Sequence, residues 1–202
     1  MTIKQLLAGA EFYVSAARPD DLPADDGREI AFAGRSNAGK SSVLNKLCAR
    51  KQLARTSKTP GRTQLINFFT VSPTMRLVDL PGYGYAKANQ TKQRQWVELL
   101  EFYFIHRQSL RGTMLIMDIR HPLQEADQTM LEWCEHYHCD VHVLLNKSDK
   151  LSRNQALKQL HLVTQELPQH ANIAISCQLF SAQTGDGLAT AYTKIGEWLE
   201  ME

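Results

Sequence analysis

One octapeptide limits the folds open to this chain more than any other feature of its sequence. Residues 34–41 read GRSNAGKS and match the pattern G-x-x-x-x-G-K-[ST] in full. They end an apolar run at Glu29–Gly34, which predicts a short buried strand, and they begin a helical pattern at Lys40–Arg50. A glycine-rich turn between a strand and a helix binds phosphates through its backbone amides and the positive end of the helix dipole. The sequence therefore predicts a phosphate-binding loop in an α/β protein.

The rest of the chain alternates apolar strand patterns with amphipathic helix patterns. Two β-rich runs, Gln64–Val71 and Met75–Leu80, flank a Ser-Pro-Thr turn and predict an antiparallel hairpin. Further strands are expected at Thr113–Ile119, Val141–Leu145 and Asn172–Cys177, and further helices at Thr91–Arg107, Leu123–Tyr137, Asn154–Leu167 and Leu188–Leu199. Such alternation predicts a mostly parallel sheet covered by helices on both faces. A single domain is expected over residues 28–202, after an N-terminal arm at 1–27.

The residue types of the phosphate loop suit a nucleotide with a bound magnesium ion. Gly34 and Gly39 permit backbone turns that other residues resist. Lys40 offers a positive charge to the β- and γ-phosphates, and the Ser41 hydroxyl can bind Mg²⁺. A plain glycine-rich turn with a solvated lysine is the alternative, and the agreement between motif and context disfavours it.

A later carboxylate and an intervening threonine complete the predicted magnesium site. Asp79 ends the second strand of the hairpin and begins the motif D-L-P-G, so it can hold a water of the Mg²⁺ shell. The amide of Gly82 in the same motif can contact a γ-phosphate. Thr63 directly precedes a strand and is favoured over Thr59 as a ligand that binds only when the γ-phosphate is present. A plain surface loop is the alternative for the segment 56–63.

A fourth motif predicts which base is recognised. Residues 146–149 read NKSD directly after an expected strand. The Asp149 carboxylate can accept hydrogen bonds from N1–H and the 2-amino group of guanine, and adenine lacks these donors. Asn146 can tie this loop to the phosphate loop, and the stem of Lys147 can cover the base. The Ala182 amide, after the last strand, can meet the guanine O6. This motif disfavours the alternatives of a P-loop ATPase or a nucleotide kinase.

Charge and composition narrow the partners and the compartment. Twelve Lys and Arg but one acid lie between Ile30 and Val97, in a chain with a formal net charge of +2. This block predicts a positive face and a polyanionic partner, unless most of these cations are simply solvated. The chain has no apolar run that could span a bilayer, no secretory signal, and four irregularly spaced cysteines, so a cytosolic protein with reduced thiols is expected. The Cys and His side chains between Cys134 and His142 match no usual zinc spacing, and ordinary packing is expected for them.

Taken together, these motifs resemble the translation-factor-like branch of P-loop GTPases, and within it the EngB family of bacterial GTPases. The resemblance covers essentially the whole chain and rests on GRSNAGKSS (34–42), KTPGRTQ (58–64), DLPGYGYAK (79–87), NKSD (146–149) and SAQTG (181–185). It implies a Ras-like P-loop GTPase domain: a three-layer α/β/α fold with a six-stranded mixed, mostly parallel sheet. It also implies binding of GTP and GDP with Mg²⁺, and hydrolysis of GTP to GDP and phosphate.

The resemblance also assigns roles to individual residues. It implies Ser41 and Thr63 as direct Mg²⁺ ligands and Asp79 as a ligand through water. The groups implied in hydrolysis are Lys40, Thr63 and Gly82. The implied nucleotide contacts are Gly34, Arg35, Ser36, Asn37, Ala38, Gly39, Lys40, Ser41, Ser42, Gly61, Arg62, Thr63, Asp79, Leu80, Pro81, Gly82, Asn146, Lys147, Ser148, Asp149, Ser181, Ala182 and Gln183. In some relatives a phosphate-loop asparagine holds K⁺ beside the phosphates, and Asn37 is a candidate for that role.

The family resemblance implies partners as well. They are the large (50S) ribosomal subunit or its precursor, with its rRNA and ribosomal proteins, and a guanine nucleotide. The implied role is a molecular switch in assembly of that subunit, needed for normal cell division and septation. A cytoplasmic monomer that binds no membrane is expected. The alternative is a division-associated binding protein in which GTP is a structural cofactor.

The position after D-L-P-G departs from many Ras-like switches, which carry a water-orienting Gln there. This chain has Tyr83, and a phenol is a poor general base at neutral pH because its ordinary pKa is about 10. The sequence therefore predicts slow intrinsic hydrolysis, with the water positioned by backbone or by a partner. Tyr83 and Tyr85 are expected either to pack against the helix at Thr91–Arg107 or to stack on RNA bases.

Overall fold

The computed structural model describes residues 1–54, 65–83, 90–167 and 172–201. Its strands are β1 (Glu11–Ala16), β2 (Arg28–Gly34), β3 (Ile66–Ser72), β4 (Met75–Asp79), β5 (Leu110–Asp118), β6 (Val141–Asn146) and β7 (Ile175–Leu179). Its helices are α1 (Ile3–Ala8), α2 (Lys40–Leu47), α3 (Gln90–His106), α4 (Glu125–His136), α5 (Arg153–Glu166) and α6 (Leu188–Trp198), with short 3₁₀ turns η1 (Pro19–Asp21) and η2 (Ser148–Lys150). No helix in these segments has the length and apolar character needed to cross a bilayer.

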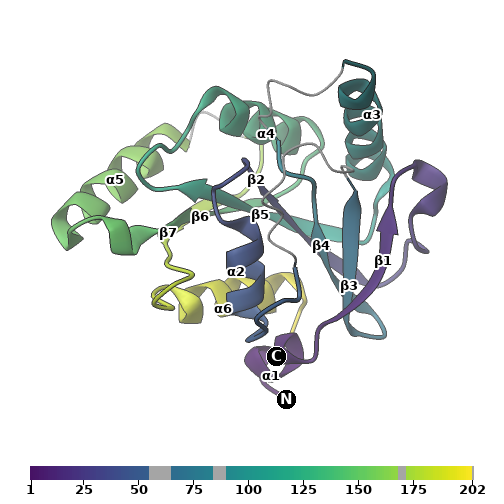
Figure 1. Cartoon of the computed structure of the whole chain (residues 1–202), viewed down its shortest axis with the longest axis horizontal. Helices are drawn as coiled ribbons and strands as arrows, with labels where there is room; N and C mark the ends of the chain where they lie inside the picture. Colours follow the sequence, from purple (N-terminus) through teal and green to yellow (C-terminus); the bar gives the residue numbers. More distant parts are fainter. Residues whose placement is uncertain (55–64, 84–89, 168–171, 202) are drawn as a thin grey trace.

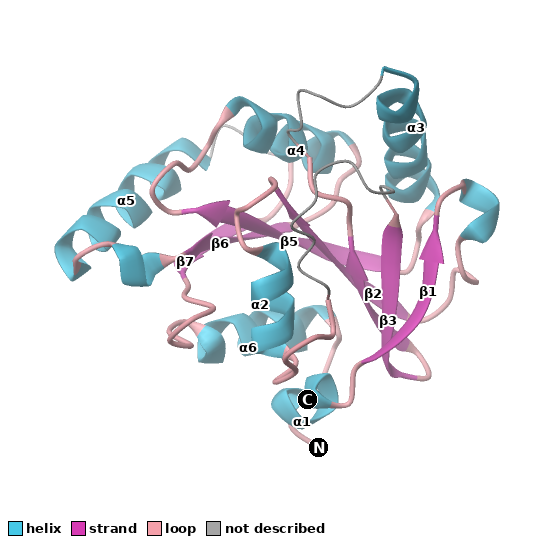
Figure 2. Ribbon diagram, viewed as in Figure 1, coloured by secondary structure: helices cyan, strands magenta, loops and turns pink. Residues whose placement is uncertain are grey.

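A mixed sheet runs through the centre of the molecule in the order β1-β3-β4-β2-β5-β6-β7 (Figure 1). The five strands from β4 to β7 are parallel, and β3 is antiparallel to both of its neighbours. Side chains of β2 alternate between the two faces, as expected for a strand buried on both sides. Ile30 and Phe32 pack with α1, α2 and α6, whereas Ala31 and Ala33 belong to the cluster with α3, α4 and α5. Helices therefore cover both faces (Figure 2), and the predicted three-layer α/β/α fold class is confirmed.

Over the described residues the sheet has seven strands, and the expected number of six is wrong. The additional strand is β1, which pairs antiparallel with β3 at the edge of the sheet. It lies within the first 27 residues, predicted as an arm before the domain, and α1 from the same stretch buries Leu6 and Leu7. Strand β1 lacks a clear alternating pattern because its register shifts between Phe12 and Val14, as at a β-bulge. Phe12 and Tyr13 are therefore both exposed.

Most of the expected elements are present with small shifts of their ends. The predicted hairpin is confirmed as β3 and β4. Strand β7 begins at Ile175 rather than at Asn172, because pairing with β6 starts where Ile175 faces Val141. The preceding amide, that of Ala174, donates a hydrogen bond to the Asp140 carboxylate at 2.9 Å.

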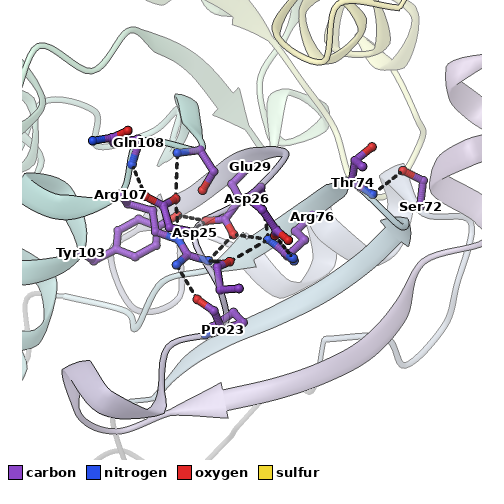
Figure 3. Close-up of polar contacts among 12 residues, drawn as sticks. Pro23, Asp25, Asp26, Glu29, Ser72, Thr74, Arg76, Tyr103, Arg107 and Gln108 are labelled. Atoms are coloured by element: carbon purple, nitrogen blue, oxygen red, sulfur yellow. Dashed lines mark hydrogen bonds and ion pairs between the residues drawn. The ribbon is translucent and has the colours of Figure 1, made fainter.

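A buried polar network lies at the end of the sheet where the central strands β2 and β4 begin (Figure 3). Glu29 is fully buried, and its carboxylate accepts hydrogen bonds from Arg76, Arg107 and Tyr103. Arg107 follows α3 and also donates to the carbonyl of Pro23 at 2.6 Å. The network fastens the end of α3 and the segment before β2 to the sheet.

The carboxyl ends of the parallel strands lie together at the opposite end of the sheet, the carboxyl edge. Gly34, Asp79, Asp118 and Asn146 end β2, β4, β5 and β6, respectively. Asp118 is directly opposite Asn146 in the register. Because ligands of open α/β sheets bind beyond the carboxyl ends of the strands, this edge is the place to look for the site.

Candidate nucleotide-binding site

The structure brings four of the five predicted nucleotide-binding segments to this edge. Residues 34–42 connect β2 to α2, and residues 79–82 follow β4. Residues 146–149 follow β6, and residues 181–183 follow β7. The fifth segment, with Gly61, Arg62 and Thr63, lies outside the described residues. Tyr85 lies outside them as well.

The backbone of the phosphate loop requires glycine at two positions. Gly39 has φ +98°, and a Cβ built there would lie 2.3 Å from Nδ2 of Asn146. That nitrogen donates to the Ala38 carbonyl at 2.9 Å, so the close approach is part of a hydrogen bond between two loops. A Cβ on Gly34 would lie 2.8 Å from the Ile116 carbonyl oxygen of the neighbouring strand. Gly34 is thus needed for close packing against β5, whereas Gly39 is needed both for its close approach to Asn146 and for its left-handed backbone.

The first turn of α2 and the end of β4 carry the charges expected around phosphates. Nζ of Lys40 pairs with Oδ1 of Asp79, and each side chain is 11% exposed. Ser41 follows Lys40 in the same turn. A serine hydroxyl and a carboxylate are hard oxygen donors of the kind that Mg²⁺ prefers, so these residues suit the ion.

Asn146 is the junction of three loops. Its Nδ2 donates to Ala38 of the phosphate loop, and its Oδ1 accepts from the amide of Ala182 at 3.1 Å. The Ser148 amide donates to the Phe180 carbonyl at 3.1 Å, which is a second hydrogen bond between the loop after β6 and the loop after β7. The predicted role of Asn146 in tying the base loop to the phosphate loop agrees with this geometry. The Ala182 amide, expected to meet guanine O6, is here bonded to Asn146.

Asp149 is held as an acceptor for donors from a base. The Ser181 hydroxyl donates to its Oδ1 at 2.6 Å, and Nζ of Lys150 lies 3.1 Å from its Oδ2. The Ser181 hydrogen bond is the largest influence that lowers the pKa of Asp149 below its ordinary value. The side chain is therefore ionised at neutral pH, with both oxygens able only to accept.

Lys147 crosses from the base loop to the phosphate loop. Its backbone is left-handed, with φ 66°, and its Nζ donates to the Asn37 carbonyl at 2.6 Å. The same nitrogen lies 2.8 Å from Oδ2 of Asp118. Arg120 donates to that oxygen from Nη2 at 2.6 Å and to Oδ1 of Asp118 from Nε at 2.9 Å. Burial raises the pKa of Asp118, but the hydrogen bonds from Arg120 and Lys147 outweigh it and leave the pKa lowered.

The sequence analysis missed Asp118 and Arg120 as part of this site. One signal could have found Asp118: it ends a buried strand parallel to the strand that precedes the NKSD motif. The hydrogen bonds from Nζ of Lys147 to Asp118 and to the Asn37 carbonyl place the Lys147 side chain beside the phosphate loop. This position suits its predicted role of covering the face of a base.

Tyr83 is buried rather than displayed. It is 5% exposed and lies in the hydrophobic cluster that contains Leu99 and Tyr103 of α3. Its hydroxyl donates to Oδ1 of Asp127 on α4 at 3.2 Å. Burial is the largest cause that raises the pKa of Tyr83 well above its ordinary value, and Asp127 adds to it. The burial of Tyr83 contradicts the alternative of RNA stacking on this residue. Its side chain shares a hydrophobic cluster with α3, the helix predicted to cover it, and its polar contact is with α4.

The Cys and His side chains near β6 do not converge on one point. His142 donates or accepts hydrogen bonds with Ser176 at 2.7 Å and Gln178 at 2.8 Å, both on β7. Cys139 instead contacts Thr113 at 3.3 Å. Within the described segments no three His, Cys, Asp or Glu side chains are grouped so that they could hold a metal ion.

The fold and the loops at the carboxyl edge define a P-loop GTPase. Comparison with known proteins agrees: residues 29–147 match a family described as 50S ribosome-binding GTPase. The chain belongs to the EngB family of GTP-binding proteins. It is 49% identical to a probable GTP-binding protein EngB of Coxiella burnetii, over 96% of this chain and 94% of the relative. A relative of the same name from Xylella fastidiosa is 50% identical, over 94% of each chain.

Solved structures agree on the fold. A crystal structure of a probable GTP-binding protein engB superposes with a TM-score of 0.67 at 20% identity, covering 86% of this chain and all of the other. A variant of Aquifex aeolicus Era bound to GDP and AlF₄⁻ has a TM-score of 0.63 at 18% identity, covering 86% of this chain and 57% of the other.

Proposed function

We propose that this GTPase is a molecular switch in assembly of the large (50S) ribosomal subunit, with GTP and GDP bound at the carboxyl edge of the sheet. The matching family, described as 50S ribosome-binding, supports this role. The basic block between Ile30 and Val97 supports a polyanionic partner such as rRNA or its precursor particle. The proposed place of action is the cytoplasm, where bacterial ribosomal subunits assemble. Normal cell division and septation would depend on this role.

The observation that carries the nucleotide site is the junction at Asn146. One side chain joins the loop predicted to bind phosphate to the two loops predicted to bind the base. The hydrogen bonds of Asn146 thereby fix the distance between the phosphate-binding loop and the base-binding loops within the protein itself. Asp149 would accept the two guanine donors, and the Lys147 stem would cover the base.

The charged groups would then serve the phosphates and the ion. Lys40 would exchange its contact with Asp79 for the β- and γ-phosphates, and the Gly82 amide would contact the γ-phosphate. Ser41 and Thr63 would bind Mg²⁺ directly, with Asp79 acting through a water. Bound Mg²⁺ neutralises charge on the β- and γ-phosphate oxygens and fixes their orientation. Asn37 is the proposed contact for a K⁺ ion.

Hydrolysis is proposed to be slow in the isolated protein. The Tyr83 hydroxyl is buried and bonded to Asp127, and its raised pKa keeps it protonated. It therefore supplies neither a base nor a water-orienting group. The attacking water would be held by backbone groups or by a partner, and a missing group of this kind can cost roughly 10³–10⁵ in rate.

Sedimentation with ribosomal particles tests the role. Tagged full-length protein is mixed with purified large subunits or their precursors without nucleotide, with GDP, or with a non-hydrolysable GTP analogue. We expect co-sedimentation to be strongest with the GTP analogue and to fall steeply as salt rises, because phosphate contacts release counterions. Equal or absent binding in all three states at low salt would contradict the proposal. That result would favour the alternative of a division-associated protein with GTP as a structural cofactor.

A further inference from the structure

A buried carboxylate on α4 joins the phosphate loop to the residue that follows D-L-P-G. Asp127 is fully buried, on a helix that carries none of the predicted nucleotide contacts. Its Oδ2 accepts from Nε of Arg35 at 2.9 Å, and its Oδ1 accepts from the Tyr83 hydroxyl at 3.2 Å. Arg35 is held further by a hydrogen bond from its Nη2 to the His121 carbonyl at 2.7 Å.

Backbone contacts reinforce this connection. The Ser36 amide donates to the Tyr83 carbonyl at 3.2 Å, and Arg35 and Tyr83 form an isolated parallel β-bridge. Gly82 lies beside the phosphate loop: a Cβ built on it would be in ordinary van der Waals contact with the Gly34 carbonyl oxygen and the Ser36 nitrogen, each at 3.7 Å. The main chain at Gly82 and Tyr83 thus contacts the phosphate loop, and the Tyr83 side chain is anchored by Asp127, which also binds Arg35 of that loop.

We propose that Asp127 is a positioning residue for GTP: acting through Tyr83, it holds the Gly82 amide where the γ-phosphate binds. The inference rests on the proposed function, in which that amide contacts the γ-phosphate. GDP has no γ-phosphate, so this arrangement strengthens binding of GTP relative to GDP. Loss of one hydrogen bond in the connection is expected to lower the affinity for a GTP analogue about 3- to 10-fold.

A purely structural role for Asp127 makes a different prediction. Asp127 also helps to start α4, because its Oδ2 accepts from the Gln124 amide at 3.2 Å. If this were its whole purpose, its substitution would destabilise the protein and change the affinities for GTP and GDP equally. The ratio of the two affinities therefore separates positioning from stability.

Tyr83→Phe is the sharpest variant because it removes only the hydroxyl. Asp127→Asn is the second variant, since it keeps the side-chain volume and removes the charge. Tyr103→Phe is a matched control: Tyr103 is also buried, and its hydroxyl donates to the Glu29 carboxylate at the same distance of 3.2 Å. That pair lies at the far end of β2 from the phosphate loop.

Dissociation constants of full-length protein are measured with Mg²⁺ for fluorescent GDP and a fluorescent non-hydrolysable GTP analogue, alongside urea unfolding. We expect Tyr83→Phe and Asp127→Asn to lower the GTP-to-GDP affinity ratio about 3- to 10-fold, with GDP binding unchanged in Tyr83→Phe, which leaves the contact of Asp127 with Arg35 intact. Tyr103→Phe should reduce stability and leave the ratio at its wild-type value.

A folded Tyr83→Phe protein with an unchanged ratio would overturn the inference, and this variant decides alone if Asp127→Asn does not fold. Failure of the proposed function has a different signature. Wild-type protein would then show no preference for GDP or GTP over adenine nucleotides, which would overturn both proposals. A wild-type preference for guanine with an unchanged variant ratio would overturn only the role of Asp127.

Discussion

Replacing Glu29 with glutamine should destabilise the fold strongly without touching the nucleotide site. Glu29 is fully buried in the network of Figure 3, and each of its two carboxylate oxygens accepts hydrogen bonds from two donors. Oε1 accepts from Arg76 at 3.2 Å and from Nη2 of Arg107 at 2.6 Å. Oε2 accepts from Nε of Arg107 at 2.9 Å and from the Tyr103 hydroxyl at 3.2 Å.

The size of the effect follows from this division. A glutamine can keep one oxygen in place, but its amino group faces the donors of the other, so two hydrogen bonds are lost. Hydrogen bonds to charged groups contribute about 1.5–3 kcal/mol each, and Glu29→Gln also leaves two buried arginines without their shared anion. Breaking a buried ion pair on one side costs about 3–5 kcal/mol. We therefore expect the free energy of unfolding to fall by about 3–5 kcal/mol.

Urea unfolding followed by circular dichroism measures this loss, provided that the slope of the transition is unchanged. Nucleotide affinity is the control. Glu29 lies five residues before Gly34 on one strand, roughly 16 Å from the phosphate loop at about 3.3 Å per residue, so GDP binding of the folded variant should match wild type. A loss of stability below about 1 kcal/mol would refute the view that the network acts as a single buried ionic unit.

Three further predictions concern the carboxyl edge. Asp149→Asn should weaken GDP binding about 10- to 100-fold and improve binding of xanthosine diphosphate, measured by competition with a fluorescent nucleotide; retained preference for GDP would contradict the assigned base contact. Gly39→Ala should reduce nucleotide affinity by at least about tenfold, because φ +98° and the Asn146 amide at 2.3 Å both oppose a Cβ; titration with fluorescent GDP tests this. Because the pKa of Asp118 is lowered in the folded protein, its stabilising effect is present above the unfolded pKa near 3.8 and is lost as pH falls through the folded value. Asp118→Asn should therefore be less stable than wild type at pH 7, with the difference shrinking below about pH 4 in thermal unfolding, and a difference independent of pH would contradict the assignment.

The motifs predicted well what depends on short stretches of chain. Strand β2, the phosphate loop and α2 follow from a local pattern, as does the hairpin of β3 and β4, because each is specified by neighbouring residues. The sequence analysis did not predict strand β1. Its bulge exposes the neighbouring side chains of Phe12 and Tyr13 together, so the alternation of buried and exposed residues that marks a half-buried strand is absent. Its place in the sheet depends on pairing with β3, more than fifty residues later, which no local pattern encodes.

The same distinction applies to the site. The NKSD motif predicted that Asn146 meets the phosphate loop, because that contact belongs to a recurring set of loops. The contacts of Arg35 with Asp127 and of Lys147 with Asp118 join residues 92 and 29 positions apart. The first depends on the position of α4, and the second on the register of β5 against β6. Aspartates are common at helix starts, so only the folded arrangement distinguishes Asp127 from a solvated one, whereas the place of Asp118 at the end of a buried strand was a signal that could have been used.

The three-way contact of Asn146 has a practical consequence. The Ala182 amide now donates to Oδ1 of Asn146, and a bound base should compete for that amide. Bound phosphates should change the shape of the loop that carries Ala38, to which Nδ2 of Asn146 donates. Both events alter the electronic surroundings of one side-chain amide group. In a ¹⁵N-labelled sample, the paired NH₂ signals of this residue would therefore act as a spectroscopic probe of nucleotide loading at both ends of the ligand.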